Sequence, residues 1–548
     1  MSTSQTAPPR LPVTVEPPPQ RPPAGHLRRW ALLLPVGVFV VTVGLRLFHL
    51  RTSYDVFLDE SIYSRISAGA ATDGRLVFGN YPFYLHGPLS FYLQAFVIRV
   101  FGIGGTAIDV IERLRVFNVL VAGGVAVLVY AIVRTITRPR WGLLGAALFA
   151  CDPFIVSFDS RLFIETLATF WVLLGFYLLL PMAVEPVTAS GTSVPPKRYG
   201  RAVAGGFAFG LALLTKETSA PLYVLPLLVC IVRGGPLRRG TAATSLGTAL
   251  VTYSPYPVIA VLTGGGYQFS YQKFGGIERM LGIIQATGYN RPGVPSLLSR
   301  VTANLGTFGM TYVLIALGGC AGVWLYRNGS ARQRWIAMWV FGAFLELAFQ
   351  IAQGTIEEQM FYYLVVPSIV AVASTAPLLL ARFGTKPLRV LAVAVVVAIA
   401  GFDLITWVGS HTGRDTAMAN AVGWMQSHAP ADSRVAPLAD GIQFLLPDYR
   451  LEFNPEAGEV SPSMLQASHS QFVVTSSLQA EQGYSAASPA LLAWLGTHAR
   501  RRFASTGATA GTVVVWELPG ALPDELPPGP EPLVPRAPIS VGAPTYKD

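Results

Sequence analysis

Long apolar runs separated by short polar loops fill the chain from residue 30 to about residue 410. The first run extends from Trp30 to about Leu47, which is long enough for a helix to cross about 30 Å of hydrocarbon. Further runs begin near residues 114, 141, 163, 201, 218, 241, 302, 333, 360 and 388. The pattern predicts a multi-pass α-helical membrane protein with about eleven transmembrane helices.

The loops after every second run are basic, which predicts the side of the membrane on which each loop lies. The residues that carry this signal are Arg134, Arg138, Arg140, Lys197, Arg198, Arg201, Arg233, Arg238, Arg239, Arg327, Arg332, Arg334, Arg382, Lys386 and Arg389. By the positive-inside rule these loops are cytoplasmic, so we expect the N-terminus inside and the C-terminus outside.

The composition agrees with a membrane protein. Hydrophobic residues make up 52% of the chain and charged residues only 13%, whereas a typical soluble domain has roughly 25% charged residues. The formal net charge of +10 is spread over the basic loops as a topology signal, and we therefore expect no nucleic-acid partner.

One apolar run does not fit the alternation of basic and non-basic loops. It extends from His86 to about Phe101 and is followed by Arg113 and Arg115. We interpret it as a helix that lies at the outer membrane surface or is re-entrant. A short crossing is the alternative, and it would invert the side of every later loop.

Composition divides the chain into four parts. Residues 1–27 are Pro-rich and predict a disordered cytoplasmic tail, residues 28–411 form the transmembrane domain, and residues 519–548 predict a second Pro-rich disordered tail. Residues 412–518 are more polar. Asp415 is expected to cap a helix that ends near His428, β-type runs occupy 471–475 and 512–516, and a second helical stretch occupies 489–498. This pattern predicts a small extracytoplasmic α/β domain.

Two adjacent carboxylates, Asp59 and Glu60, follow the first apolar run in a predicted outer loop. Asp59 is in a position to cap a helix, because Ile62, Ile66 and Ala70 follow at helical spacing. A cap is compatible with a catalytic site. The two interpretations, helix cap and catalytic carboxylate, therefore both stay open.

Three further polar clusters occur at the predicted outer ends of spans. Arg161 and Glu165 have the spacing of an i,i+4 ion pair, but Glu165 lies inside an apolar run, where an ionisable group is costly and often functional. Lys216 and Glu217 form a turn between two short runs, as an ion pair or a phosphate site. The last cluster is Glu357, Glu358, Tyr362 and Tyr363, where acids suit a helix start and tyrosines suit the membrane interface.

The ordered set of motifs resembles the polyprenyl-phosphate-sugar-dependent (GT-C type) glycosyltransferases, such as the protein O-mannosyltransferases and the lipid A aminoarabinose transferase. The resemblance spans roughly residues 30–410 and rests on Asp59-Glu60, His86-Gly87-Pro88-Leu89, Arg161 with Glu165, Leu214 to Thr218, and Tyr362 to Pro367. There are two departures. Gly87 stands where many members have Pro, which leaves the local turn open. Glu165 stands where the aminoarabinose transferases have Asp, which leaves the subfamily and the sugar open.

The resemblance implies inverting, metal-independent transfer of a sugar from a polyprenyl-phosphate donor to an acceptor hydroxyl on the extracytoplasmic face. Asp59 would be the catalytic base, with Glu60 or Glu165 orienting the base or the acceptor. Lys216, Arg161 and Arg75 would stabilise the leaving phosphate. The other candidate substrate-binding residues are His86, Glu217, Glu358 and Tyr362. No cofactor is expected, and the acceptor can be a lipid, a glycan or a protein.

Two other classes of function compete with transfer. A membrane transporter or flippase would need polar residues deep in several spans and two related halves, but the charges collect at one side and no internal repeat is evident. A scaffold that presents the C-terminal domain would leave the outer carboxylates unexplained. Convergence of Asp59, Glu165 and Lys216 on one cavity would favour the enzyme.

Overall fold

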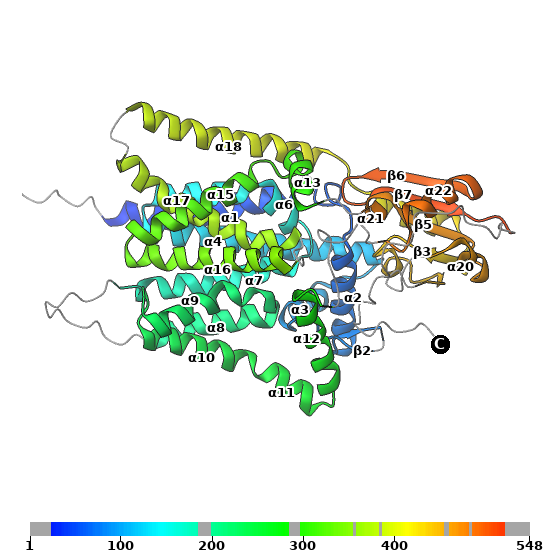
Figure 1. Ribbon diagram of the computed structural model, residues 1–548, viewed down its shortest axis with the longest axis horizontal. Helices are drawn as coiled ribbons and strands as arrows, with labels where there is room; N and C mark the ends of the chain where they lie inside the picture. The colour runs from blue at the N-terminus through cyan, green and yellow to red at the C-terminus, as the bar shows by residue number, and fades with distance from the viewer. Residues whose placement is uncertain are drawn as a thin grey trace, which may run out of the picture.

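The computed structural model describes residues 24–79, 81–184, 199–283, 296–353, 358–382, 386–453, 460–481 and 485–520. Most helices run side by side in a bundle, and a small five-stranded sheet lies beyond one end of it (Figure 1). The predicted class, a multi-pass helical protein with a small α/β region near the C-terminus, is thereby confirmed. The two predicted tails lie outside the described residues, apart from residues 24–27, which begin the first helix, and residues 519–520.

Each of the eleven predicted runs is occupied by a helix or a broken helix. These are α1 (Ala24–Leu47), α4 (Ala107–Ile136), α5 (Pro139–Cys151) with α6 (Pro153–Asp159), α7 (Ile164–Leu179), α8 (Tyr199–Thr215), α9 (Pro221–Arg233), α10 (Arg239–Tyr253) with α11 (Pro255–Leu262), α15 (Thr311–Asn328), α16 (Ala331–Gln353), α17 (Tyr362–Arg382) and α18 (Lys386–Thr412). Within the described ranges, six helical stretches are long and apolar enough to cross a membrane, or seven if α5 and α6, bent by 66°, form one span. The difference from eleven arises because several of the runs fold as short or broken helices.

Short elements link the long helices. They are α2 (Leu58–Asp73), β1 (Val77–Phe78), β2 (Tyr81–Pro82), α3 (Leu89–Phe101), α12 (Gly266–Met280), α13 (Leu297–Ala303), α14 (Leu305–Phe308) and the 3-10 turns η1 (Leu180–Met182), η2 (Glu217–Ser219) and η3 (Glu358–Phe361). Helix α2 runs across the end of the bundle (Figure 1). Helix α3 has 13 residues, about 20 Å of helix, which is too short to cross the hydrocarbon and fits the predicted surface or re-entrant segment.

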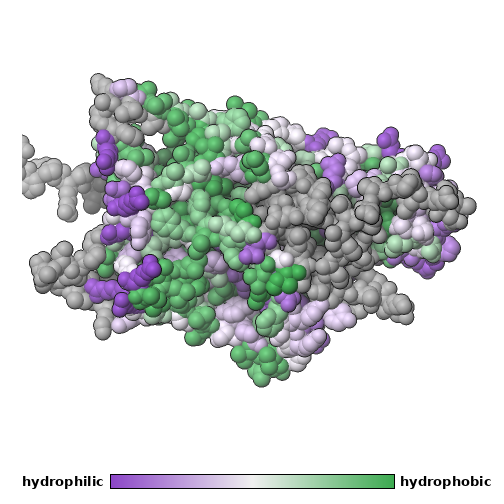
Figure 2. Space-filling model, in the orientation of Figure 1, coloured by the Kyte–Doolittle hydropathy of each residue, from purple (hydrophilic) through white to green (hydrophobic). Residues whose placement is uncertain are grey.

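Basic residues gather at one end of the bundle. The α9–α10 and α17–α18 connections, which carry Arg233, Arg238, Arg239 and Arg382, lie at the end opposite the sheet (Figure 1). In Figure 2 hydrophilic residues gather at that end, and a broad hydrophobic surface covers the middle of the bundle. The predicted basic loops and the C-terminal sheet are therefore on opposite ends of the molecule.

The C-terminal part is a layered α/β unit. Its sheet has the order β4-β3-β5-β7-β6, with β4, β3 and β5 parallel and β7 and β6 antiparallel. The central strand β5 is buried on both faces, because Phe472 and Val474 pack against one helix while Val473 packs against another. The elements are α19 (Ala417–His428), β3 (Arg434–Pro437), η4 (Ile442–Phe444), β4 (Arg450–Leu451), α20 (Pro462–Ala467), β5 (Phe472–Ser476), α21 (Ser477–Glu481), α22 (Pro489–His498), β6 (Arg500–Gly507) and β7 (Gly511–Glu517).

A buried carboxylate from the loop between α1 and α2 connects this unit to the bundle. Asp55 accepts hydrogen bonds from the backbone N–H groups of Met418 and Ala419 at the start of α19. Burial raises the pKa of Asp55 to about 6, although these backbone hydrogen bonds oppose the shift. The prediction that Asp415 caps this helix is wrong, because the Asp415 carboxylate accepts hydrogen bonds from the N–H and hydroxyl of Thr509 instead.

We expect Asp55→Ala to loosen the start of α19. The substitution leaves two helix N–H groups without an acceptor, a loss worth about 1–2 kcal/mol for a helix cap. Trypsin cleavage after Arg414, which is exposed just before the helix, should therefore become faster than in the wild type. Asp448→Ala, which removes an exposed carboxylate of the same unit, is the matched control, and equal cleavage of both variants would contradict the connection.

Candidate functional site

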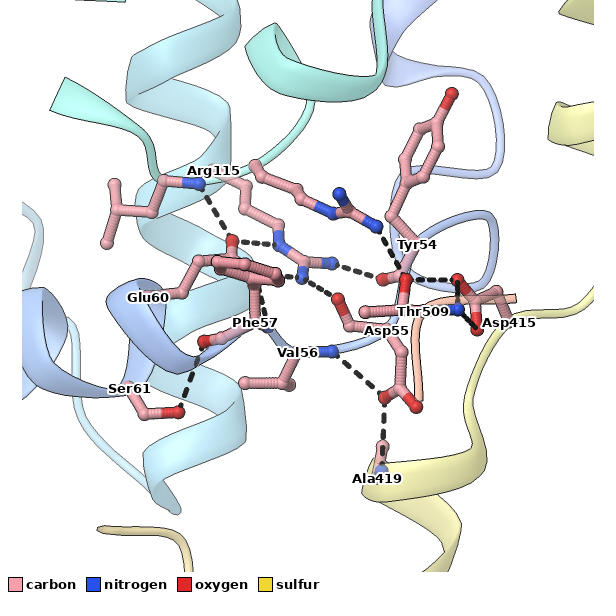
Figure 3. A network of polar contacts seen from close by, with 12 residues as sticks. Tyr54, Asp55, Val56, Phe57, Glu60, Ser61, Arg115, Asp415, Ala419 and Thr509 are labelled. Atoms are coloured by element: carbon pink, nitrogen blue, oxygen red, sulfur yellow. Dashed lines mark hydrogen bonds and ion pairs between the residues drawn. The ribbon is translucent and has the colours of Figure 1, made fainter. Parts of the chain in front are cut away.

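The start of α2 is fixed by one carboxylate, that of Glu60. Its Oε1 accepts hydrogen bonds from Arg115 Nε (2.8 Å) and the N–H of Leu162 (2.7 Å), and its Oε2 from Arg115 Nη2 (2.7 Å) and the N–H of Phe57 (3.0 Å) (Figure 3). Burial alone would raise the pKa of Glu60, but the charge and hydrogen bonds of Arg115 outweigh it and lower the pKa. Both oxygens of Glu60 are thus committed to holding the fold.

This arrangement changes the roles predicted for the acidic pair. The helix begins at Leu58 with Phe57 as its N-cap residue, and Glu60 accepts the N–H of Phe57, so the prediction that Asp59 is the N-cap is wrong. Glu60, predicted as a catalytic residue, is instead buried with four hydrogen bonds from protein groups. Asp59 is only half-buried. Of the two, Asp59 is the carboxylate that an acceptor can reach.

Asp59 is the first member of a chain of three polar side chains. The hydroxyl of Tyr63, one helical turn later, donates to Asp59 Oδ2 at 3.4 Å and lies 3.2 Å from Nε2 of His86. Because the tyrosine hydroxyl has one proton, donation to Asp59 makes Nε2–H of His86 the donor to Tyr63. The structure therefore places His86, predicted as a binding residue, beside the predicted base.

His86 is half-buried and lies within electrostatic range of three cations. Burial, followed by the charges of Lys216, Lys273 and Arg279, lowers the pKa of His86 well below its usual range. The imidazole is therefore neutral near pH 7 and can take part in the chain of hydrogen bonds as a neutral donor. Its backbone carbonyl accepts a hydrogen bond from Tyr256 Oη at 2.9 Å, which fixes the loop against α11.

The side chains of Lys216 and Glu217 point to different partners. Lys216 pairs with Glu165 in the interior, whereas Glu217 pairs with Lys273 of α12 and accepts a hydrogen bond from Tyr253 Oη at 3.1 Å. Burial lowers the pKa of Lys273, although Glu217 opposes the shift. The two members of the predicted Lys-Glu pair therefore bind different partners.

Arg161 does not pair with Glu165 as the i,i+4 spacing suggested. Its Nη2 donates to Thr509 Oγ1 at 2.6 Å, and its guanidinium lies over the rings of Tyr54 (5.0 Å) and Phe57 (5.9 Å). Its Nε has no hydrogen-bond partner. Within the described ranges Arg161 forms no ion pair, so it keeps its full charge close to the start of α2.

Three predicted binding residues lie elsewhere. Tyr362 is buried and donates to Asp159 Oδ1 at 2.7 Å, in an internal network with the fully buried Arg46–Asp159 ion pair, so it is not an interfacial anchor. Arg75 is exposed beyond the far end of α2, about 20 Å from Asp59 along the helix. The side chain of Glu358 lies outside the described residues.

Gly87, the departure in the His-containing element, has a steric reason. A Cβ at this position would lie 2.1 Å from the carbonyl oxygen of Leu214 and 2.8 Å from that of Leu213. The loop with His86 therefore packs directly on the backbone at the end of α8, next to Lys216. The absence of a Cβ at Gly87 is what allows this close approach.

Sequence reasoning missed several residues of the site. Tyr63 and Lys273 were assigned no role from the sequence. A usable signal was the helical spacing of Asp59 and Tyr63, which puts both on one face. No group of three His, Cys, Asp or Glu side chains suited to a metal ion occurs in the ranges that the structure describes.

Comparison with known proteins adds independent information. A family model described as dolichyl-phosphate-mannose-protein mannosyltransferase matches residues 85–259, about a third of the chain. Among solved structures, the oligosaccharyltransferase AglB from Archaeoglobus fulgidus, in complex with an inhibitory peptide and a dolichol-phosphate, has 12% identity and a TM-score of 0.59, over 90% of this chain and 74% of that chain. ArnT from Cupriavidus metallidurans bound to undecaprenyl phosphate has 14% identity and a TM-score of 0.53, over 89% and 98%. No curated protein sequence matches the chain.

These matches and the spanning helices define the class. The chain is a multi-pass membrane protein with the fold of the GT-C glycosyltransferases, and the resemblance drawn from its motifs is confirmed. The matched stretch 85–259 contains five of the ten predicted site residues, namely His86, Arg161, Glu165, Lys216 and Glu217.

Proposed function

We propose that the protein transfers a sugar from a polyprenyl-phosphate donor to an acceptor hydroxyl, with inversion, and that Asp59 is the base. The observation that carries this proposal is the Asp59–Tyr63–His86 chain beside the cation Arg161. A hydroxyl is a weak nucleophile, and a carboxylate within hydrogen-bond reach takes its proton as the bond to the anomeric carbon forms. The leaving phosphate is already anionic and needs charge stabilisation rather than a proton.

Arg161 is the best-placed cation for the leaving phosphate. Lys216, to which the sequence assigned this role, is already neutralised by Glu165, and Lys273 is paired with Glu217. Arg161 is only partly buried and contacts the ring of Phe57, two residues before Asp59. The phosphate would therefore lie close to the start of α2, the helix end that also carries Asp59.

The proposal places this site on the extracytoplasmic face. Its support is the separation of the two ends of the molecule, because the basic connections lie opposite the sheet (Figure 1) and basic loops are cytoplasmic by the positive-inside rule. The donor's polyprenyl chain would lie against the apolar helices. The acceptor, a lipid, a glycan or a protein, would enter from the aqueous side. A transporter is the less favoured alternative, because the family model that matches residues 85–259 describes a transferase.

A direct test uses purified protein in lipid nanodiscs with radiolabelled polyprenyl-phosphate sugars and a membrane extract as the source of acceptor. We expect release of polyprenyl phosphate together with labelled product, at a rate that an excess of EDTA leaves unchanged. Loss of transfer after chelation would contradict metal independence. Movement of intact donor across the bilayer without release of polyprenyl phosphate would contradict the enzyme and favour a flippase.

We expect Arg161→Gln to weaken donor binding about 10- to 100-fold, the effect of losing a hydrogen bond to a charged group. The rate at saturating donor should change less. Thr509→Val removes the contact of Arg161 with the C-terminal unit but keeps the charge, so it should preserve donor affinity. Arg65→Gln, an exposed position of α2, is the matched control, and equal affinity of all three variants would contradict the role in phosphate binding.

A further inference from the structure

A second group of polar side chains lies in the interior of the bundle. It includes Lys216 but not Asp59. We call it the inner polar cluster, and its members are Glu165 of α7, Lys216, Thr218 of η2, Glu346 and Gln350 of α16, and Tyr363 of α17. Lys216 pairs with Glu165, and Gln350 Nε2 donates weakly to Glu346 Oε1 at 3.4 Å. The charge of Lys216 also acts on Glu346, and Tyr363 lies within electrostatic range of both carboxylates.

Most of these side chains have a polar atom without a hydrogen-bond partner. The atoms are Glu165 Oε2, Thr218 Oγ1, Glu346 Oε2, Gln350 Oε1 and the hydroxyl of Tyr363, all of them buried. The Glu165 side chain is 0% exposed, and Gln350 is 1% exposed as a residue. A folded protein leaves few buried polar atoms unpartnered, because each one loses its hydration without compensation. Thr218 and Tyr363 can bond each other, but Glu165 Oε2, Glu346 Oε2 and Gln350 Oε1 still have no partner. Three such oxygens in one cluster indicate a site whose occupant brings hydrogen-bond donors.

The donors and acceptors define the chemistry of that occupant. Glu165 Oε2, whose carboxylate is paired with Lys216, and Gln350 Oε1 can only accept, so the occupant has to bring donors. The charge of Lys216 is already balanced by Glu165, which disfavours a phosphate. A ring that carries several hydroxyl groups satisfies both conditions, and so does a hydroxylated ring with an amine.

The surroundings connect this ring to a lipid carrier. Leu345 and Phe349 precede Glu346 and Gln350 by one residue each and are 58% and 41% exposed, so the apolar face of α16 looks outward beside the cluster. Arg161, the cation for the phosphate, is four residues before Glu165 in the chain. A lipid-linked donor can thus place its phosphate at Arg161 and its sugar toward Glu165.

We propose that the inner polar cluster binds the sugar residue of the lipid-linked donor, and that Gln350 and Tyr363 select for its hydroxyl groups. The proposal rests on the proposed function for the identity of the carrier. It assigns the sugar to the cluster and leaves proton removal to Asp59, so the two roles are carried by different residues.

The test compares carriers with and without a sugar. Binding of undecaprenyl phosphate is measured in nanodiscs against the same carrier bearing mannose, glucose or 4-amino-4-deoxyarabinose. The wild type should bind at least one glycosylated carrier about tenfold more tightly than the bare carrier, and Gln350→Leu and Tyr363→Phe should each lose most of that preference. The exposed positions Gln353 and Tyr326 provide the matched controls Gln353→Leu and Tyr326→Phe, which should keep it.

The outcomes separate this inference from the proposed function. Equal binding of bare and glycosylated carriers by the wild type would overturn the inference, and so would a preference that survives in both cluster variants, because water would then fill the cluster. Asp59→Asn should retain the sugar preference although transfer is lost. A preference that depends on the cluster, in a protein whose transfer does not depend on Asp59, would support the sugar site and refute the base.

Discussion

Asp59→Asn is expected to reduce sugar transfer about 10²–10⁴-fold, the usual contribution of a general base. The amide is nearly isosteric with the carboxylate and can still accept the hydrogen bond from Tyr63, so the helix start should remain intact. What it cannot do is take the proton of the acceptor hydroxyl. The measurement is the single-turnover rate at saturating donor, together with the donor affinity, which should change little.

The same helix offers a control for this substitution. Asp73 is the last residue of α2 and is exposed, so Asp73→Asn makes the same chemical change away from the Tyr63–His86 chain. We expect transfer at the wild-type rate. If Asp59→Asn also transfers at that rate while the protein stays folded in the membrane, Asp59 is not the base.

Arg115→Met is expected to destabilise the protein by about 3–5 kcal/mol, the cost of leaving one member of a buried ion pair unpaired. Arg115 is 1% exposed and Glu60 is fully buried, so the Glu60 carboxylate would keep its charge without its main partner. The free energy of unfolding in mixed detergent micelles measures the loss. The Glu60→Gln/Arg115→Met double variant should recover part of it, because no unpaired charge remains.

An exposed ion pair nearby provides the comparison. Arg51 and Glu112 lie 3.3 Å apart with side chains 73% and 21% exposed, and such pairs contribute at most about 1 kcal/mol. Arg51→Met should therefore have a small effect. Equal effects of Arg51→Met and Arg115→Met would show that the Glu60 pair does not hold the start of α2.

The helices, and the gathering of basic residues at one end of the bundle, could be predicted, because both depend on local composition. Apolar runs make helices wherever lipid or protein surrounds them, and the β-type run at 471–475 is β5, with a shift of one residue. The Pro489–His498 helix was likewise predicted with its bounds. These features need no knowledge of distant partners.

The pairing of charges could not be predicted, because it depends on contacts between distant segments. Glu60 meets Arg115 across 55 residues, and Lys216 meets Glu165 across 51. Arg161 and Glu165 had the spacing of a pair, yet Arg161 turned to Thr509, 348 residues away. Local spacing therefore gave the candidates but not the division between Glu60, which holds the fold, and Asp59, which is half-buried and accepts from Tyr63.

The contact of Asp55 with α19 has a consequence for the order in which the chain is made. Asp55 lies four residues before Asp59, and its carboxylate accepts a hydrogen bond from the N–H of Met418, 363 residues later. At the usual speed of a ribosome, roughly 20 to 70 s pass between the synthesis of the two partners. The loop that precedes Asp59 therefore gains this contact only after the start of α19 has been synthesised. A nascent chain that ends before α19 would hold Asp59 and Tyr63 without this support.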